Sequence, residues 1–320
     1  MVGGDFRVLA IDSGQGDCTL VQCPNGSNIL IDCGSTRHGE SSREHVREVL
    51  ERELGDAGIH ALVLTHPDRD HYNWLPEVVG ARDVARVLFA GDPSAYSEGE
   101  MPTWMRGRVA VTFFGERHDP PEAPSDILDC GPVDVHVLAA NAPAGGGEAD
   151  DRGWNSNSGS IVLRFGLPGA DRALAILTGD ATWYTERAIR EAYPVSFLRA
   201  QLLRLGHHGT SVTSTEQEWV EAVQPSAAFS SAGHHASWRH PRCVVVDRVE
   251  AASSLSAASC HWTECGTPTT GECDSSSTQG WCRRRSEVAY FDTFSSGEID
   301  FRFTNGELVE PQVARGRCGG

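Results

Sequence analysis

Lysine is absent from the chain, and all 27 basic side chains among its 320 residues are arginines. Without a lysine amine, the protein cannot form a Schiff base with a carbonyl substrate, and it cannot hold a nucleotide phosphate as the lysine of a P-loop does. A GC-rich coding bias and the avoidance of lysine modification both explain the absence, and the sequence does not separate them. The chemistry of the chain therefore has to come from other groups.

Long apolar segments are also missing. The first residues, MVGGDFRVLAIDSGQGD, carry acidic side chains where a secretory signal needs a basic start and an unbroken apolar stretch. No later apolar run approaches the length that crosses a bilayer. We therefore expect a soluble, cytoplasmic protein with no membrane partner.

Positive charge is scarce, because the formal net charge is −17. A strongly acidic chain repels nucleic acid and other polyanions, so such a substrate would need a local basic patch or bound metal. The candidates for such a patch are Arg239, Arg242 and the run of Arg283, Arg284 and Arg285. The triple arginine also fits a solvated loop beside a carboxylate.

Seven of the ten cysteines fall into two groups. Three lie in apolar, strand-like runs and are predicted to be small core residues: Cys18, Cys23 and Cys33. Four lie in a stretch rich in Ser, Thr and Gly: Cys260, Cys265, Cys273 and Cys282. The second group fits disulfides, a structural zinc site with His261, or free thiols, and its spacing matches no zinc module closely.

Strand-like and helix-like patterns alternate along the chain. The opening is typical of a strand, a tight turn, a second strand, an Asn25-Gly26 hairpin turn and a third strand. Further strands are expected at 60–66, 85–91, 133–140, 160–166, 173–180, 202–209 and 226–231, and helices at 41–55, 182–193 and 214–223. Residues 243–251 fit a helix or a strand, and residues 286–308 are expected to form a closing hairpin.

Two successive β-rich halves with interspersed helices predict an α/β protein in which two sheets pack together with helices outside, a four-layer αββα sandwich. We assign residues 1–250 to the core of this sandwich and 251–286 to a Cys/Ser/Thr-rich insert. Residues 287–320 would form a C-terminal hairpin that completes the core, and a tail.

One segment after an apolar strand is rich in potential metal ligands. The stretch THPDRDH follows HALVL and offers four of them: His66, Asp68, Asp70 and His71. Alone, it equally fits a polar loop whose acids face solvent and whose histidines cap the next helix. A set rich in carboxylates and free of sulfur suits zinc or manganese.

Two other apolar strands end in ligands of the same kind. Asp180 follows ALAILTG, and His207 and His208 follow LLRLG. Strand ends that meet at one edge of a sandwich can present their side chains to a common centre. Together, the three segments predict a dinuclear metal site between the two sheets.

The pattern HxDxDH resembles the signature HxHxDH of the metallo-β-lactamase superfamily, with Asp68 in place of the second histidine, as in the hydrolase domain of ComEC-type competence proteins. Other segments are similar to that subgroup in the same order: IDSGQGDCTLVQCPNGSNILIDCG, NSNSGSIVLRFG, AILTGDA, LRLGHHGTS and the late His240-Pro241. The similarity runs from Phe6 to Arg248. It implies the αββα sandwich and a hydrolase with two divalent metal ions, Zn or Mn.

The resemblance also implies roles for the matching positions. The metal ligands would be His66 and Asp68 for the first ion, Asp70 and His71 for the second, Asp180 as a bridge, and His207 or His208 to complete the second site. The catalytic residues would be Asp70 and Asp180 as proton acceptors, and His240 facing the substrate. There, His240 would bind a phosphoryl oxygen or donate a proton.

Other matching positions would surround these ligands. Asp32 resembles the aspartate that orients ligands or loop amides, and Gln15 and Asp17 would line the same edge. Where the family usually has a third-motif histidine, this chain has NSNS. The first ion would then be held by Asn157 or by water and be exchangeable, although Asn155 and Asn157 equally fit loop and cap hydrogen bonds.

Hydrolysis by a metal-bridged water, without a covalent enzyme intermediate, is the reaction that the resemblance implies. Our leading hypothesis is a phosphodiesterase or DNA nuclease, whose substrate is nucleic acid or another phosphodiester. A small phosphoester, a carboxylic ester or a lactam is the alternative substrate. A third hypothesis is a non-enzymatic subunit of a defence or modification system with a protein partner, and the intact acidic ligand set argues against it.

Overall fold

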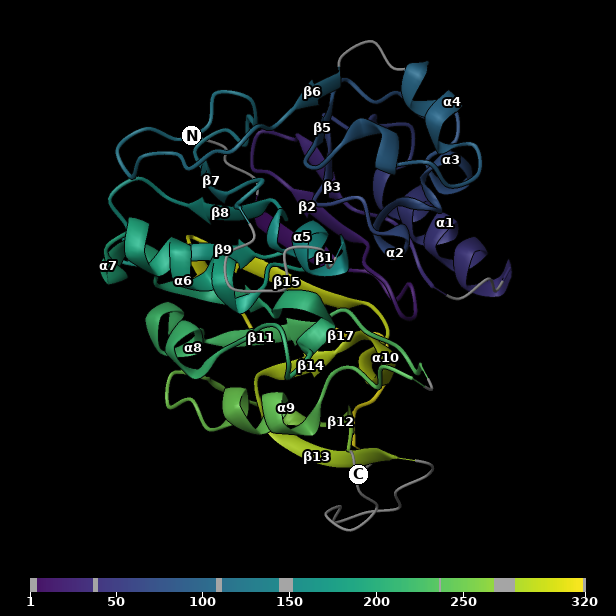
Figure 1. Ribbon diagram of the computed structural model, residues 1–320. Coiled ribbons are helices and arrows are strands. Elements are labelled where there is room, and N and C mark those ends of the chain that lie inside the picture. Colours follow the sequence, from purple (N-terminus) through teal and green to yellow (C-terminus); the bar gives the residue numbers. More distant parts are fainter. Residues whose placement is uncertain are drawn as a thin grey trace.

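Two β-sheets face each other, and helices cover their outer faces (Figure 1). The computed structural model describes residues 5–36, 40–107, 111–143, 152–235, 237–267 and 280–318. Within these ranges, no helix has the length and apolar character needed to cross a membrane.

The first sheet combines N-terminal strands with strands from the end of the chain. Its order is β16-β15-β1-β2-β3-β4-β5-β6, and β17 also pairs with β15. Its strands are β1 (Phe6–Ala10), β2 (Thr19–Gln22), β3 (Asn28–Ile31), β4 (Ala61–Leu64), β5 (Val87–Phe89), β6 (Val111–Phe113), β15 (Ile299–Thr304), β16 (Glu307–Leu308) and β17 (Gln312–Val313). From β3 to β6 the strands are parallel. The helices of this half are α1 (Glu40–Leu54), α2 (Arg69–Tyr72), α3 (Leu75–Val78) and α4 (Met101–Arg106), and a 3₁₀ turn, η1, spans Pro93–Ala95.

The second sheet has the order β14-β11-β10-β9-β8-β7. Its strands are β7 (Asp134–Ala139), β8 (Val162–Gly166), β9 (Ala173–Leu177), β10 (Ala200–Arg204), β11 (Ala227–Ser230) and β14 (Tyr290–Asp292), and the run from β9 to β14 is parallel. The helices of this half are α5 (Arg152–Ser158), α6 (Trp183–Ala192), α7 (Val195–Leu198), α8 (Gln217–Val223), α9 (Cys243–Glu250) and α10 (Thr293–Ser296), with a 3₁₀ turn, η2, at Gly206–Gly209. Residues 243–251, which the pattern left open, are thus mainly helical.

Three apolar layers hold the sandwich together, one between the sheets and one under the helices on each side. Strand β4 shows how the sequence produces them. Ala61 and Val63 face the layer between the sheets, whereas Leu62 and Leu64 face the layer under α1. A strand that is buried on both faces is a continuous apolar run in sequence. The predicted four-layer α/β fold is confirmed.

The end of the chain differs from the predicted hairpin at 286–308. β14 pairs with β11 in the second sheet, whereas β15 pairs with β1 in the first. The chain crosses between the sheets through α10, where the carboxylate of Asp292 accepts the Ser295 N–H at 2.7 Å. The hairpin that does form is shorter and joins β15 to β16. Alternating apolar residues look the same in a hairpin and in two strands of separate sheets, which is why the pattern misled.

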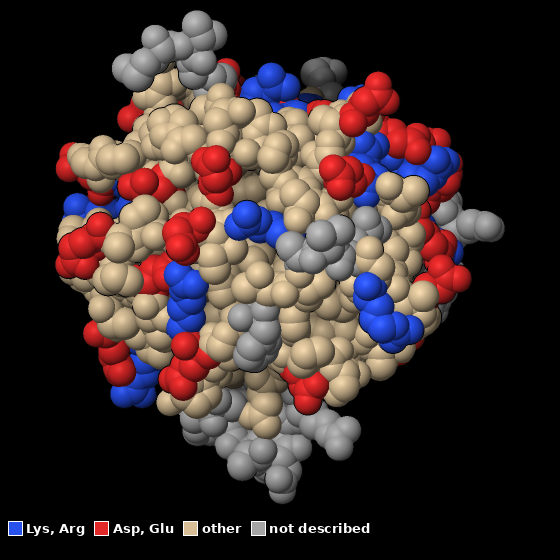
Figure 2. Space-filling view, turned by 90° about the horizontal axis from the view of Figure 1, so that it is seen from above, with Lys and Arg blue, Asp and Glu red and all other residues tan. Residues whose placement is uncertain are grey.

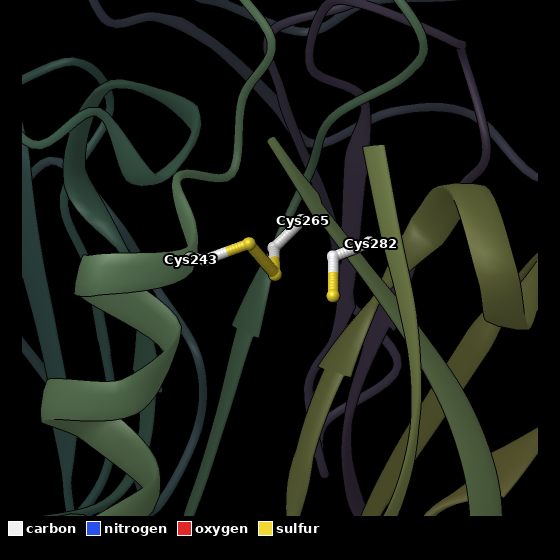
Figure 3. Close-up of side chains that lie close together, drawn as sticks. All are labelled: Cys243, Cys265 and Cys282. Carbon is white, nitrogen blue, oxygen red and sulfur yellow. A yellow bond between two sulfur atoms is a disulfide. The ribbon is translucent and has the colours of Figure 1, made fainter. Parts of the chain in front are cut away.

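The cysteine-rich region contains a separate two-stranded sheet of β12 (Ala257–Gly266) and β13 (Trp281–Val288). One disulfide joins Cys265 to Cys243 on α9 (Figure 3). Another joins Cys260 to Cys318. Cys282 lies beside the first of these and is itself disulfide-bonded. Disulfides therefore replace the zinc and free-thiol alternatives at these positions, and Cys273 lies outside the described residues.

The predictions for Cys23 and His261 need correction. Cys23 is buried as expected, but it is bonded to Cys130 rather than being a plain core residue, because the two side chains meet across 107 residues of sequence. The ring of His261, the proposed zinc partner, contacts the Tyr290 carbonyl oxygen through Nε2 at 2.7 Å. Cys18 and Cys33 are buried free thiols.

We predict that replacing both Cys243 and Cys265 by serine lowers the free energy of unfolding by about 2–4 kcal/mol, because the disulfide restricts the unfolded chain. Chemical denaturation followed by circular dichroism, under non-reducing conditions, measures the change. Replacement of the exposed Ser253 by alanine is the control and should have little effect. Equal denaturation midpoints for the double variant and the wild type would contradict the prediction.

Candidate metal centre

Strands from both sheets end at one rim of the sandwich. In the first sheet, β3 and β4 lead into Asp32 and His66, and in the second sheet β9 and β10 lead into Asp180 and the pair His207 and His208. β3 is parallel to β4, and β9 is parallel to β10, so that their carboxyl ends lie side by side. The fold therefore gathers segments that are far apart in sequence.

The loop after β3 holds the turn that follows β4 in place. A Cβ atom on Gly34 would lie 2.7 Å from the carbonyl carbon of Asp70, so the loop packs directly against the first turn of α2. The N–H of Cys33 donates to the His71 carbonyl at 2.7 Å, and the N–H of Asp17 donates to the Asp70 carbonyl at 3.2 Å. The short helix that carries Asp70 and His71 is thus held by backbone contacts.

Three non-glycine residues at the rim have left-handed backbone conformations. The φ angles are 55° at Asp32, 47° at His207 and 56° at His208. Each such residue costs on the order of 1–3 kcal/mol and persists only where its surroundings enforce it, which is common at functional sites. The concentration of this strain at strand ends marks the rim as a candidate site.

One carboxylate oxygen lies at the centre of the rim. Asp180 Oδ2 is 3.2 Å from His71 Nε2, 3.3 Å from His208 Nε2, 3.8 Å from His207 Nε2 and 3.9 Å from His66 Nε2. Asp180 itself is 2% exposed. Imidazoles contributed by both sheets therefore converge on a single buried oxygen.

Two groups of donor atoms, each within 4.8 Å, share the ring of His71: His66, His71 and Asp180, and Asp70, His71 and His208. A third such group, Asp17, Asp32 and His71, includes the same ring. Asp68 Oδ2 lies 3.8 Å from His66 Nε2, beside the first group. Within the described residues, the buried Nε2 atoms of His66, His71 and His208 make no hydrogen bond. Imidazole nitrogens that face carboxylates and lack a hydrogen-bond partner fit a divalent metal ion.

The adjacent histidines have different neighbours. His208 Nε2 lies 3.3 Å from both Asp70 Oδ2 and Asp180 Oδ2, and its Nδ1 is 2.7 Å from the carbonyl oxygen of Ser231. His207 is farther from the central carboxylate of Asp180, at 3.8 Å. His208 is therefore the histidine that the structure groups with Asp70.

Asp32 orients one of the imidazoles. Its Oδ2 lies 2.7 Å from His71 Nδ1 and accepts the Thr65 hydroxyl at 2.6 Å, while its Oδ1 accepts the Thr65 N–H at 2.8 Å. With Nδ1 held in this way, the Nε2 of His71 faces Asp180. Such a contact is how a neighbouring carboxylate fixes the orientation of a metal-binding histidine.

Arg204 is a site residue that the sequence analysis did not identify. Its buried guanidinium lies 2.7 Å from Asp17 Oδ2 and 3.4 Å from Asp180 Oδ1, and it also donates to the carbonyl oxygens of Gly179 and Leu205. Arg204 thus contacts one oxygen of Asp180 and leaves the other to the imidazoles. The available signal was an arginine inside the apolar run LLRLG, because a buried guanidinium requires a carboxylate partner.

The third-motif asparagines lie on α5, next to the donors. Asn157 is buried, its Nδ2 lies 3.4 Å from His207 Nδ1, and its Oδ1 makes no hydrogen bond within the described residues. Ser156 donates its hydroxyl to Asp68 Oδ1 at 2.7 Å. The main-chain carbonyl of Asn155 accepts the Gly159 N–H at 3.1 Å, which is the contact of a helix end. Asn157 therefore has a buried side-chain oxygen available next to His207.

Gln15 and His240 lie near the donors without belonging to the two groups. The side-chain oxygen of Gln15 accepts the Gly233 N–H at 3.2 Å. The ring of His240 has its centroid 5.6 Å from that of His207 and 6.4 Å from that of His208. His240 is thus placed to contact a molecule at the rim rather than to join the donors that surround Asp180.

The carboxylates and imidazoles shift one another's pKa. Burial alone would lower the pKa of both His71 and His208. The negative charges of Asp180 and Asp32 outweigh burial at His71 and raise its pKa well above the usual value. Asp180 has the same effect on His208. The pKa of His208 rises to about 9. Burial would raise the pKa of Asp180, but His208 and His71 hold it well below its usual value, and His208 lowers the pKa of Asp70 to about 2 despite burial.

Two other pKa values follow from burial. Burial raises the pKa of Asp68 to about 6, against the opposing hydrogen bond from Ser156. Burial lowers the pKa of His240 to about 2, and the positive charges of His207 and His208 act in the same direction. His240 is therefore a neutral imidazole throughout the ordinary pH range.

Comparison with known proteins identifies the family. The family model of the Metallo-beta-lactamase superfamily matches residues 11–234. The chain belongs to this superfamily. Membership gives it a metal-dependent fold of the hydrolase type, and the matched range contains all the donors around Asp180.

Two curated relatives match most of the chain. ComE operon protein 3 of Bacillus subtilis (strain 168) is 28% identical over 265 residues, and Competence protein ComA of Neisseria gonorrhoeae is 28% identical over 254 residues. The matches cover 78% and 77% of this chain. The chain spans about a third of the length of these relatives, 31% and 30%. The resemblance to ComEC-type competence proteins is confirmed.

Solved structures with a similar fold include two metalloproteins. CmlA, a diiron beta-hydroxylase from Streptomyces venezuelae, has a TM-score of 0.47 and 16% identity, covering 76% of this chain and 50% of that chain. Igni18, a metallo hydrolase from the archaeon Ignicoccus hospitalis KIN4/I, has a TM-score of 0.45 and 13% identity, covering 78% of this chain and 93% of that chain.

We predict that the affinity of the rim for Mn²⁺ or Zn²⁺ falls as the pH is lowered from about 8 to about 6. Because the pKa values of His71 and His208 are raised, both imidazoles carry a proton in this pH range, and a metal ion must displace it. For each displaced proton, the affinity for the metal should fall by up to about tenfold per pH unit. Calorimetric titration in buffers of different ionisation enthalpy counts the released protons. An affinity that is constant across this range would refute the prediction.

We also predict that Arg204→Met lowers the free energy of unfolding by about 3–5 kcal/mol, because it leaves the buried carboxylates of Asp17 and Asp180 without their cation. Thermal and chemical unfolding of the chelator-treated protein measure the effect. The matched control is Arg187→Met, which removes an exposed i,i+4 pair with Glu191 and should cost less than about 1 kcal/mol. Equal effects of the two substitutions would contradict the prediction.

Proposed function

We propose that the chain is a metal-dependent phosphodiesterase that cleaves nucleic acid. The observation that carries the proposal is that three imidazole nitrogens without a hydrogen bond among the described residues, the Nε2 atoms of His66, His71 and His208, converge on the carboxylates of Asp70 and Asp180. The competence proteins that the chain resembles support nucleic acid as the substrate class. Superfamily membership supports hydrolysis as the reaction.

We assign two divalent ions, Zn or Mn, to the rim. The first would be held by His66, Asp68, Asp180 and the side-chain oxygen of Asn157, and the second by Asp70, His71, His208 and Asp180. When bound, the ions would polarise the scissile phosphoester and lower the pKa of a water molecule. Because Asn157 stands near where the family usually has a histidine, the first ion would be held there by an amide oxygen, which is a weaker ligand than an imidazole.

The chain's own residues orient these ligands and handle protons. Asp32 holds the ring of His71, and Arg204 holds one oxygen of Asp180. The low pKa of Asp70 and Asp180 keeps their Oδ2 atoms ionised and able to accept hydrogen bonds from the attacking water. Of the two roles expected for His240, its low pKa favours binding of a phosphoryl oxygen over proton donation, because a neutral imidazole of this kind is a poor proton source at neutral pH.

An open pocket lies beside two of the carboxylate donors, Asp68 and Asp70. Its volume is about 460 Å³, and its lining includes Asp68, Asp70, Arg69 and Trp238. Arg69 contributes a positive charge there, 3.8 Å from the carboxylate of Glu98. The pocket is large enough for a nucleotide-sized group rather than only for a small ester.

The expected basic patch on the triple arginine does not support a broad polyanion-binding surface. These arginines lie on β13, where Arg284 is 2.5 Å from Asp247, Arg283 is 4.0 Å from Glu264, and the Arg285 guanidinium contacts Cys260 Sγ at 3.2 Å. Among the described residues on the face drawn in Figure 2, acidic and basic side chains are interspersed without a continuous positive area. Substrate binding would therefore depend on the rim and its pocket.

We predict that Asp70→Asn and Asp180→Asn each lower the hydrolysis of bis-p-nitrophenyl phosphate and of single-stranded DNA by about 100-fold or more, because each removes a charged metal ligand. Initial rates with added Mn²⁺ or Zn²⁺ and the metal content of the purified variants are the measurements. The exposed Asp171→Asn variant is the matched control and should retain wild-type rates. Full activity in Asp70→Asn and Asp180→Asn would overturn the assignment.

The same assay separates the possible substrates. Cleavage of single- or double-stranded DNA together with the small ester supports the proposed nuclease. Cleavage of the small ester alone would replace it with a hydrolase of small phosphoesters, a function compatible with the net charge of −17. Metal binding without hydrolysis of any of these substrates would favour a hydrolase of carboxylic esters or lactams, or a non-enzymatic subunit.

A further inference from the structure

One large aromatic side chain is exposed on the surface that the structure describes. Trp238 is 43% exposed, and the other exposed large apolar side chains among the described residues are all valines. An indole ring left in water forfeits the favourable burial that tryptophan usually obtains. An exposed tryptophan at a functional site therefore calls for a ligand.

The indole ring of Trp238 is held in place by a second ring. It stacks on the imidazole of His235 with ring centroids 4.1 Å apart and an interplanar angle of 19°. The main-chain N–H of Trp238 also donates to His235 Nδ1 at 3.3 Å. The stack covers one face of the indole and restricts its rotation, while the exposed part of the ring stays available.

Trp238 lies at the pocket beside the metal donors. It lines the same space as Asp68 and Asp70, although it is far from both in sequence. A phosphodiester bound at the donors would thus bring its neighbouring groups to the indole. In nucleic acid the group next to each phosphodiester is a sugar that carries a base.

We propose that Trp238 is a stacking platform for an unpaired nucleobase, which deepens the proposed function and rests on it. Every base has a π-face, so an aromatic platform binds single strands with little sequence preference. The bases of a duplex are already stacked on their neighbours and cannot reach the platform without being extruded. The subsite therefore makes the enzyme prefer single-stranded substrate near the scissile bond.

The proposal is tested with Trp238→Ala and Trp238→Phe on a single-stranded oligothymidylate of about 12 nucleotides, and on the same strand with abasic sites, with Mn²⁺ present. For Trp238→Ala we expect kcat/KM on oligothymidylate to fall by about 5- to 100-fold. Trp238→Phe should keep most of the activity, because phenylalanine still stacks. On the abasic strand the wild type should be slow, and Trp238→Ala should change the rate little.

Val195→Ala, at another exposed apolar position, is the matched control, and melting temperatures verify that each variant is folded. If folded Trp238→Ala keeps the wild-type kcat/KM on oligothymidylate, the proposed role of Trp238 is wrong, but the proposed nuclease activity still stands. An equal loss on the oligothymidylate and the abasic strand would also overturn that role, because a lost base contact cannot affect a strand without bases. A wild type that hydrolyses bis-p-nitrophenyl phosphate but neither strand would overturn the proposed nuclease as well.

Discussion

The two oxygens of the Asp180 carboxylate face different partners, and the rim depends on this division. Oδ1 faces the guanidinium of Arg204, while Oδ2 faces the imidazoles. A carboxylate buried without partners would be too costly to keep ionised, and one engaged on both oxygens by arginine would have nothing left for a metal ion. Arg204 also contacts Asp17, so a single internal cation stabilises two carboxylates and directs one of them.

The remaining negative charge is what makes the site suitable for cations. Asp32 is also buried and Asp70 is partly buried, and their neighbours His71 and His208 have raised pKa values because of the carboxylates around them. Protons and divalent ions therefore compete for the same nitrogens. The competition links the protonation of the rim, its metal content and the stability of the fold in one equilibrium.

This equilibrium requires both sheets. Asp32, His66 and His71 come from the first half of the sandwich, whereas Asp180 and His208 come from the second. The apolar layer between the sheets sets the spacing between these two sets of side chains. A change that moved one sheet relative to the other would separate the donors even if each strand stayed intact, so packing far from the rim contributes to its geometry.

Features carried by local patterns could be predicted from the sequence. Apolar strands ending in His or Asp indicated the rim, and the two β-rich halves indicated the layered fold. Features that depend on distant pairing could not be predicted in this way. The Cys23–Cys130 disulfide and the crossing from β14 to β15 join segments whose local patterns are compatible with several partners. Arg204 gave a local signal, but the identity of its partners depends on how Asp17 and Asp180 meet in space.

The acidity of the chain limits how a polyanion could bind to it. With a net charge of −17, the protein repels nucleic acid at long range, which opposes its approach. Short-range interactions must then supply the affinity: the charge of bound cations at the rim, the guanidinium of Arg69 in the pocket and the indole of Trp238. Stacking is well suited to this role because it does not depend on the sign of the protein's charge. An acidic surface that excludes polyanions generally, together with a local site that accepts them, gives selectivity for strands that can place a phosphate and a free base in the pocket at the same time.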